Sequence, residues 1–277
     1  METAPGNQHN KPMKKIERII ILGAGNVATH LGNALSGAGK EILQVYSRTR
    51  LSASQLARQL NCSYTTNIKE INPSADLYIF SLADKAMVPC LKDFPHKNVF
   101  LVHTSGSLDI NILQYYNCSK GVFYPLQTFS RQVSLDFSNI PVCIEADTPE
   151  NIQVLCNLAS EISNDVRIID SGKRETLHLA AVFACNFTNH MFAIAQEVLQ
   201  KEQVSFDILH PLIHETLQKA YQNNPKDVQT GPAKRNDNYI IKKHLQKLDG
   251  LPDYQKIYTF ISESIIQFHK NINDTND

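Results

Sequence analysis

The sequence of 277 residues predicts an α/β protein, with a doubly wound, mostly parallel sheet followed by an all-α C-terminal domain. Three observations support this prediction. Short apolar runs alternate with amphipathic stretches up to about residue 170, which is typical of strands joined by crossover helices. A tight glycine turn separates the first apolar run from the first amphipathic stretch. From about residue 172 onward, only helical patterns occur.

The glycine turn follows the apolar run 19–22 and opens a helix. Gly23 lets the chain leave the strand through backbone angles that a side chain would forbid. Gly25 removes a Cβ where the backbone would have to approach phosphates, and the amides of Asn26 and Val27 then face an anion with the help of the helix dipole. This pattern is typical of a Rossmann-like, dinucleotide-binding fold, although a purely structural turn would share it.

The remaining elements follow in order along the chain. Strands are expected at 41–46, 63–65, 75–81, 98–103, 121–124, 141–144 and 166–169. Between them, a helix is expected at 51–60, and another begins at Thr148-Pro149-Glu150, which combines a capping residue, a proline at the first helical position and an early acid. The helical half is expected to contain helices at 175–202, 206–223, 238–248 and 254–271.

These patterns divide the chain into three parts. Residues 1–15 are polar and have no apolar core of a secretion signal, so we expect a disordered tail. We expect residues 16–170 to form the Rossmann-like domain and residues 171–277 to form the helical domain. The first half of the helix 175–202 is apolar nearly all round, which predicts burial inside a helical bundle or across a subunit interface.

Composition excludes several classes of partner. Lys+Arg and Asp+Glu are both 27, so no net charge favours nucleic acid or an anionic membrane. No apolar run is long enough to span a bilayer. The six cysteines are scattered without metal-ligand spacing, so we expect no metal site and reduced thiols in a cytoplasmic protein.

The end of the second expected strand indicates which dinucleotide binds. An NAD-binding protein normally has Asp or Glu there for the ribose 2′-hydroxyl. This chain instead has the segment 46–50, YSRTR, in which Ser47 and Arg48 could hold a 2′-phosphate. The sequence therefore favours NADP over NAD, unless the arginines are simply a solvated turn.

Ligands in such folds lie beyond the carboxyl ends of the strands. Leu82 and Ala83 follow one such end, and His103 and Ser105 follow the next, where the nicotinamide ring is expected. Gln127 follows the strand after that and is expected to reach the substrate. The alternative for the serine-rich segment 103–107 is the capping of a helix.

Several motifs together resemble one family. The glycine turn, VYSR, HTSGS, YPLQTF, LHLAAVFACNFTNH and GPAKRND resemble, in this order, a family of NADP oxidoreductases with a Rossmann-like N-terminal domain and a C-terminal helical domain of unknown function. That family is similar to pyrroline-5-carboxylate reductase, prephenate dehydrogenase and the 6-phosphogluconate/hydroxyacid dehydrogenase superfamily. The resemblance implies that the helical domain closes the active site and forms a homodimer. Many members have His where this chain has Tyr124, and this departure argues against a proton-transfer role for the position.

The long helix carries the candidate catalytic residues. At about 100° per residue, His178 and Asn189 share a face, with Asn186 to the side. Polar side chains on an apolar helix need partners. We expect His178 to act as general acid/base and Asn186 to orient the substrate, with Asn189 beside them. The alternative is a structural core histidine with asparagines that bridge helices.

Arg235, in GPAKRND, could hold a substrate carboxylate through two parallel hydrogen bonds, or it could form a surface ion pair.

Two functions follow from these residues. The first is an NADP-dependent oxidoreductase that transfers a hydride to or from a small carbonyl, hydroxy or imino acid. The second is a non-catalytic NADP(H)-binding sensor or regulatory protein, favoured by the absence of the catalytic lysine of the hydroxyacid dehydrogenases.

Overall fold

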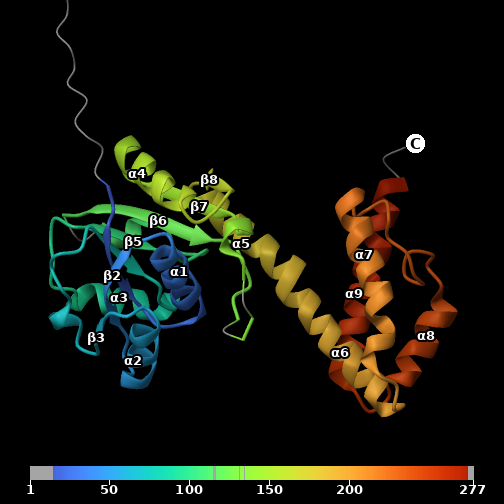
Figure 1. Ribbon diagram of the computed structural model, residues 1–277. Helices are drawn as coiled ribbons and strands as arrows, with labels where there is room; N and C mark the ends of the chain where they lie inside the picture. Colours follow the sequence, from blue (N-terminus) through green and yellow to red (C-terminus); the bar gives the residue numbers. More distant parts are fainter. Residues whose placement is uncertain (1–14, 115–116, 131, 134, 274–277) are drawn as a thin grey trace, which may run out of the picture. The chain divides into compact units, whose positions relative to one another are not determined.

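The computed structural model describes residues 15–114, 117–130, 132–133 and 135–273 (Figure 1). The expected tail at 1–15 lies outside the described residues except for Lys15. Contacts divide the chain into two compact units between Cys185 and Asn186, and each unit is described here by itself. The domain boundary expected near Asp170 from composition stays a prediction. In the structure, the helix Ser171–Ala181 belongs to the first unit, which ends at Cys185.

An eight-stranded sheet forms the first unit, in the order β3-β2-β1-β4-β5-β6-β7-β8. All neighbouring strands are parallel except β6 and β7, which are antiparallel. The prediction of a mostly parallel, doubly wound sheet is therefore confirmed. The strands are β1 (Arg18–Leu22), β2 (Glu41–Tyr46), β3 (Ser63–Thr65), β4 (Leu77–Phe80), β5 (Phe100–His103), β6 (Ser119–Pro125), β7 (Val142–Ala146) and β8 (Val166–Ile168).

Helices cover both faces of this sheet because alternate strand residues point to opposite sides. Ile19 and Ile21 of β1 pack with α1, α2 and α4, whereas Ile20 and Leu22 pack with α3 on the other face. The four helices are α1 (Asn26–Gly37), α2 (Arg50–Gln59), α3 (Asp84–Asp93) and α4 (Pro149–Ser160). α4 begins as its sequence predicts, with the Thr148 hydroxyl accepting from the Asn151 amide at 3.1 Å.

The long C-terminal helix differs from the expected single helix at 175–202. It begins earlier, at Ser171, because the Asp170 carboxylate caps it by accepting from the Lys173 amide at 2.9 Å. A π-helical segment, Val182–Phe187, then separates α5 (Ser171–Ala181) from α6 (Thr188–Lys201). A π turn takes one residue more than an α turn, so the side chains do not follow a single progression of about 100° per residue. The expectation that His178 and Asn189 share a face assumed an uninterrupted α-helix and does not hold.

The second unit contains α6, α7 (His210–Gln222), α8 (Asn238–Lys247) and α9 (Pro252–Asn273), and no strand among its described residues. Asp237 caps α8 by accepting from the Ile240 amide at 3.1 Å, and Gly250 turns the chain before α9 with φ +78°. The predicted all-α C-terminal domain is confirmed.

One helical stretch of the described chain, Ser171–Lys201, is long and apolar enough by length and composition to cross a membrane. Core helices of soluble proteins have the same property, so this is weak support for a membrane span. The expectation that no apolar stretch is long enough to span a bilayer is therefore wrong for this helical stretch, whereas the expectation of no membrane partner stays a prediction.

Candidate functional site

A groove runs along the edge of the sheet where the strands β2, β1, β4, β5 and β6 end. Two cavities of about 670 Å³ and 410 Å³ make it up. They adjoin, because both are lined by Gly25, Ser81, Leu82 and Ala83. The parallel strands bring these loops to one edge, so the predicted position of the ligand site at the carboxyl ends matches the geometry.

The glycine turn lies where the two cavities meet. Gly23 has φ +128°, and a Cβ there would lie 2.0 Å from the carbonyl oxygen of Ser81. At Gly25, by contrast, an added Cβ would have no neighbour within 4 Å, and the backbone is extended just before α1. Gly23 is thus required by the fold, whereas Gly25 leaves open space in front of the first amides of a helix, as a phosphate needs.

The larger cavity has a basic end beside β2. Ser47 and Arg48 line it as predicted, and so do Ser52 of α2 and Lys85 of α3. Asp93 is its acidic lining residue. No acid follows β2, where NAD-binding folds normally place one for the ribose 2′-hydroxyl.

The smaller cavity carries a cluster of hydroxyl groups around one carboxylate. Ser105 donates to the Asp84 carboxylate at 2.8 Å, and Ser107 donates to the other oxygen of the same group. Thr104 donates to the Ser81 hydroxyl at 3.2 Å. Ser105 therefore lines the groove as predicted, and its hydroxyl is engaged with Asp84.

His178 and Tyr124 lie together in the wall of the smaller cavity. The Tyr124 hydroxyl is 3.2 Å from Nδ1 of His178. His178 is half-buried, and its ring is nearly perpendicular to that of Tyr124, at 77°. The structure thus places the predicted acid/base residue in the groove, next to a tyrosine for which the sequence predicted no proton-transfer role.

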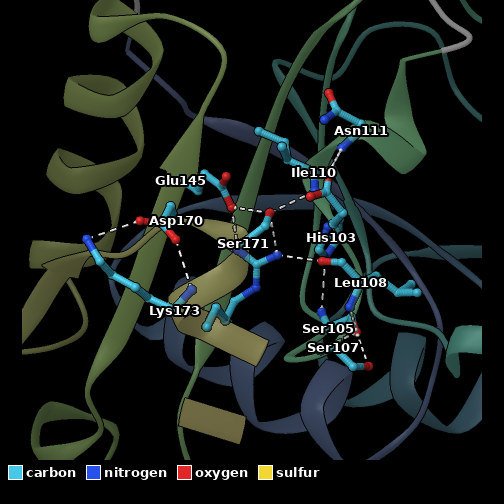
Figure 2. A network of polar contacts seen from close by, with 12 residues as sticks. His103, Ser105, Ser107, Leu108, Ile110, Asn111, Glu145, Asp170, Ser171 and Lys173 are labelled. Carbon is cyan, nitrogen blue, oxygen red and sulfur yellow. Dashed lines mark hydrogen bonds and ion pairs between the residues drawn. The ribbon is translucent and has the colours of Figure 1, made fainter. Parts of the chain in front are cut away.

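A buried network fixes the start of α5 to the sheet, as Figure 2 shows. The Arg174 side chain is 0% exposed and pairs with the Glu145 carboxylate of β7. It also donates to the Leu108 carbonyl and, at 3.1 Å, to the Ser171 hydroxyl. Ser171 in turn donates to Glu145 at 2.7 Å. Arg174 precedes His178 by four residues, so the network fixes the helical face from which His178 projects.

His103 differs from the other predicted cofactor residues, because it is fully buried and lines neither cavity. Its Nδ1 accepts from the Ser105 amide at 3.2 Å, so the neutral ring carries its proton on Nε2. Burial lowers the pKa of His103 to about 4, with the nearby Arg174 charge acting in the same direction. In this geometry the imidazole is neutral at neutral pH and supports the loop that follows β5 rather than facing a ligand.

Three more predicted residues lie in the wall of the smaller cavity. Val27 and Gln127 line it, and Asn26 does so while its side-chain amide donates to the Phe129 carbonyl at 2.8 Å. The segment that follows β6 thereby crosses the N-terminus of α1. The predicted cofactor residues of α1 and the predicted substrate residue Gln127 are brought to one place.

The remaining predicted site residues belong to the second unit. Asn186 is exposed in the π-helical segment, Asn189 is exposed on α6, and Arg235 is exposed in the turn before α8. Their roles in a substrate site stay predictions.

Several residues of the site were not selected from the sequence: Asp84, Lys85, Gly106, Glu145 and Arg174. Arg174 is the neighbour of Lys173, whose side chain is 79% exposed and pairs with Asp170, so the local sequence does not indicate which of the two is buried. The available signal was its spacing of four residues from His178. Glu145 had no local signal, because its partner is 29 residues away. Among the described residues, no group of His, Cys, Asp and Glu has the arrangement of a metal site.

Comparison with known proteins identifies two regions of the chain. Residues 18–105 match the family described as "NADP oxidoreductase coenzyme F420-dependent", and residues 140–265 match the "Domain of unknown function (DUF2520)". No protein with curated annotation matches the chain.

Solved structures extend the similarity to nearly the whole chain. A "putative NADP oxidoreductase" from Bacteroides fragilis is 45% identical, with a TM-score of 0.87 over 91% of this chain and 98% of the other. A protein from Thermotoga maritima is 19% identical, with a TM-score of 0.66 over 92% and 99% of the two chains. A reductive aminase from Aspergillus terreus, solved with NADPH and ethyl-5-oxohexanoate, is 14% identical, with a TM-score of 0.68 over 94% and 95%. The last two similarities show the fold alone.

The two glycines of the turn are predicted to respond differently to alanine. Gly23→Ala should lower the free energy of unfolding by about 3 kcal/mol or more, because a positive φ and a backbone clash both oppose the methyl group. Gly25→Ala should change it by about 0.5 kcal/mol or less, because the added Cβ meets open space in an extended backbone. Urea unfolding followed by circular dichroism measures both, and equal losses would contradict this account of the turn.

The buried ion pair between Arg174 and Glu145 is predicted to contribute far more to the free energy of unfolding than an exposed ion pair in the same unit. Arg174→Ala should destabilise the protein by about 3–5 kcal/mol, because it leaves Glu145 partly buried and unpaired. The matched control is Arg167→Ala, which removes the exposed pair with Asp165 and should cost about 1 kcal/mol or less. The same unfolding measurement compares them, and an Arg174→Ala variant as stable as the control would show that the network does not fix α5.

Proposed function

Because the chain belongs to the family of NADP oxidoreductases that carry the DUF2520 domain, we propose that it transfers a hydride between NADP(H) and a small carbonyl, hydroxy or imino acid. The observation that carries this proposal is the pair of adjoining cavities along the carboxyl edge of the sheet, one lined by Arg48 and Lys85 and the other by Tyr124 and His178.

The residues of the groove fit an extended dinucleotide. The open space at Gly25, in front of the amides of Asn26 and Val27, suits the pyrophosphate. Leu82 and Ala83 line both cavities and lie where the two halves of a dinucleotide would join. When bound, the nicotinamide supplies the hydride, and the protein supplies orientation, a proton and exclusion of water.

The preference for NADP over NAD rests on the basic end of the groove. Ser47 and Arg48 offer a hydroxyl and a planar cation to a 2′-phosphate, and Lys85 adds a second cation from α3. Without an acid after β2, the ribose 2′-hydroxyl of NAD has no carboxylate partner there.

The opposite end of the groove supports acid–base chemistry. An imidazole exchanges protons near neutral pH, and His178 lines the cavity within hydrogen-bonding distance of Tyr124. The reductive aminase of similar fold makes a carbonyl or imine carbon a reasonable hydride acceptor. Within the second unit, taken by itself, the Arg235 guanidinium would suit a carboxylate, and the amides of Asn186 and Asn189 would suit other polar atoms.

A non-catalytic NADP(H) sensor is the second candidate, favoured by the absence of the lysine that hydroxyacid dehydrogenases have on the corresponding helix. NADPH oxidation against a panel of 2-oxo acids and cyclic imines separates the two functions. NADPH binding without turnover of any member would favour the sensor.

We further propose a cytoplasmic homodimer. All six cysteines are free thiols, which suits a reducing compartment. Leu179 and Phe183 of the apolar helix are 58% and 63% exposed, and the second unit has an apolar cavity of about 570 Å³ lined by residues of α6, α8 and α9. Apolar surface of this extent is typical of interfaces between subunits.

The cofactor preference is predicted to depend on Arg48. Arg48→Ala should weaken NADPH binding about tenfold or more, because a hydrogen-bonded charge on the 2′-phosphate is lost, and should leave NADH binding nearly unchanged. Isothermal titration calorimetry with both coenzymes measures this. The matched control is Arg50→Ala, because Arg50 is bound to the Tyr64 hydroxyl at 3.3 Å and does not line the groove. Equal losses for NADPH and NADH in Arg48→Ala would refute the 2′-phosphate assignment.

The homodimer is predicted to require the apolar face of α5. The wild-type chain of 31.2 kDa should have twice this mass in solution, and Leu179→Glu should shift it to the monomer, because a charge would be buried at the interface. Light scattering coupled to gel filtration measures the mass. Leu51→Glu, at an exposed leucine of α2, is the control and should stay dimeric. A monomeric wild type, or a dimeric Leu179→Glu variant, would contradict the proposal.

A further inference from the structure

Tyr124 and His178 form a hydrogen-bonded pair inside the smaller cavity. Tyr124 is the penultimate residue of β6 and is 9% exposed, whereas His178 is half-buried on α5. Their contact joins the hydroxyl to Nδ1 at 3.2 Å, with the ring centroids 6.3 Å apart. Nδ1 faces the tyrosine, which leaves Nε2 as the ring nitrogen available for proton exchange with water or with a ligand.

Gly106 makes the contact between the two rings possible. A Cβ at this position would lie 2.8 Å from Cγ and Nδ1 of His178 and 2.9 Å from Cζ of Tyr124. Both rings therefore pack directly on the glycine backbone in the loop after β5. Three segments distant in sequence, the loop after β5, the end of β6 and the second turn of α5, converge on this one contact.

The neighbouring hydroxyl groups of the cavity have other partners. Ser105 and Ser107 donate to Asp84, which can accept a proton but has none to give when ionised. Thr104 donates to Ser81. Tyr124 differs from these groups, because its partner is an imidazole that can both accept a proton and return one.

We propose that Tyr124 gives a proton to the substrate heteroatom and that His178 replaces this proton, a proposal that rests on the reductase function proposed above. The sequence comparison with family members, many of which have His at this position, argued against such a role. The structure favours it, because the tyrosine hydroxyl lines the cavity and has a proton-exchanging partner behind it.

The proton step balances without any change of oxidation state in the protein. The two electrons reach the substrate carbon as the hydride of NADPH, and negative charge develops on the substrate oxygen or nitrogen. The O–H bond of Tyr124 breaks as a new bond from hydrogen to that heteroatom forms. His178 in its neutral Nδ1–H tautomer then restores the tyrosine hydroxyl: its Nδ1–H bond breaks while the Nε2 lone pair binds a proton from solvent. The ring ends neutral with its proton on Nε2 and returns to the Nδ1–H tautomer by exchange with solvent before the next turnover.

The charges around the pair keep the tyrosine protonated. Burial is the main cause that raises the pKa of Tyr124 to about 12; the Cys143 thiol on β7 acts in the same direction, and Arg174 on α5 opposes them. Asp84, at the start of α3, lines the same cavity. With a raised pKa, Tyr124 holds its proton throughout the neutral range and has it available for the substrate.

Tyr124→Phe and His178→Gln in the full-length protein test the proposal. With NADPH and a panel of 2-oxo acids and cyclic imines, Tyr124→Phe should lower kcat about a hundredfold with KM nearly unchanged, as expected for loss of a general acid. His178→Gln keeps a hydrogen-bonding group but cannot pass on a proton, so kcat should fall about tenfold or more with KM nearly unchanged, and an unchanged kcat would overturn the role of His178. An unchanged kcat in Tyr124→Phe would overturn the proposal and leave the reductase function intact.

A second measurement needs no turnover. The ¹⁵N resonance of His178 Nδ1, assigned by its absence in His178→Gln, should move in cofactor-free Tyr124→Phe because the hydrogen bond is lost; an unchanged resonance would overturn the proposal. Tyr64→Phe removes an exposed hydroxyl on β3 and should alter neither kcat nor this resonance.

Calorimetry with NADPH should give equal affinity for all variants. Failure of the wild type to bind NADPH, or to turn over any substrate, would overturn the reductase function and the proton relay with it.

Discussion

The close packing of the glycine turn against the end of β4 is the constraint on which the rest of the site depends. The backbone at Gly23 lies so near the Ser81 carbonyl that no side chain fits, and this contact sets the two loops side by side. It leaves the first amides of α1 open to the groove. The same groove continues past β5 and β6, because parallel strands end at a common edge.

A second constraint places the acid–base residues at the far end of that groove. α5 has partly buried Leu177 packed against the sheet cluster that contains Tyr124, and its one fully buried side chain is the Arg174 guanidinium. The network of Arg174, Glu145 and Ser171 adds a polar attachment to the sheet. His178, four residues later, thereby meets Tyr124 across the backbone of Gly106. Buried charge in this protein positions a reactive group as well as holding a helix.

The parts of the fold that follow local patterns could be predicted from sequence. Strand β2 was predicted with its observed bounds, because the apolar pattern that marks a strand depends only on residues within that strand. The glycine turn was also located correctly, because its signal lies in a few consecutive residues. The π-helical segment could not be predicted, since the apolar residues of 182–187 fit either helix type. Arg174 could not be distinguished from its solvated neighbour Lys173, because its burial depends on Glu145 and Leu108, which are distant in sequence. His103, expected at the cofactor, supports a loop instead.

The central claim is that the groove at the carboxyl edge holds a phosphorylated nicotinamide dinucleotide. The most direct measurement is a calorimetric titration of NADPH into wild-type protein that has been unfolded, stripped of carried-over ligand and refolded. Saturable binding near one equivalent per chain, tighter than for NADH, is the predicted result. An absence of saturable heat with either coenzyme, in protein whose circular dichroism shows the native fold, would contradict it.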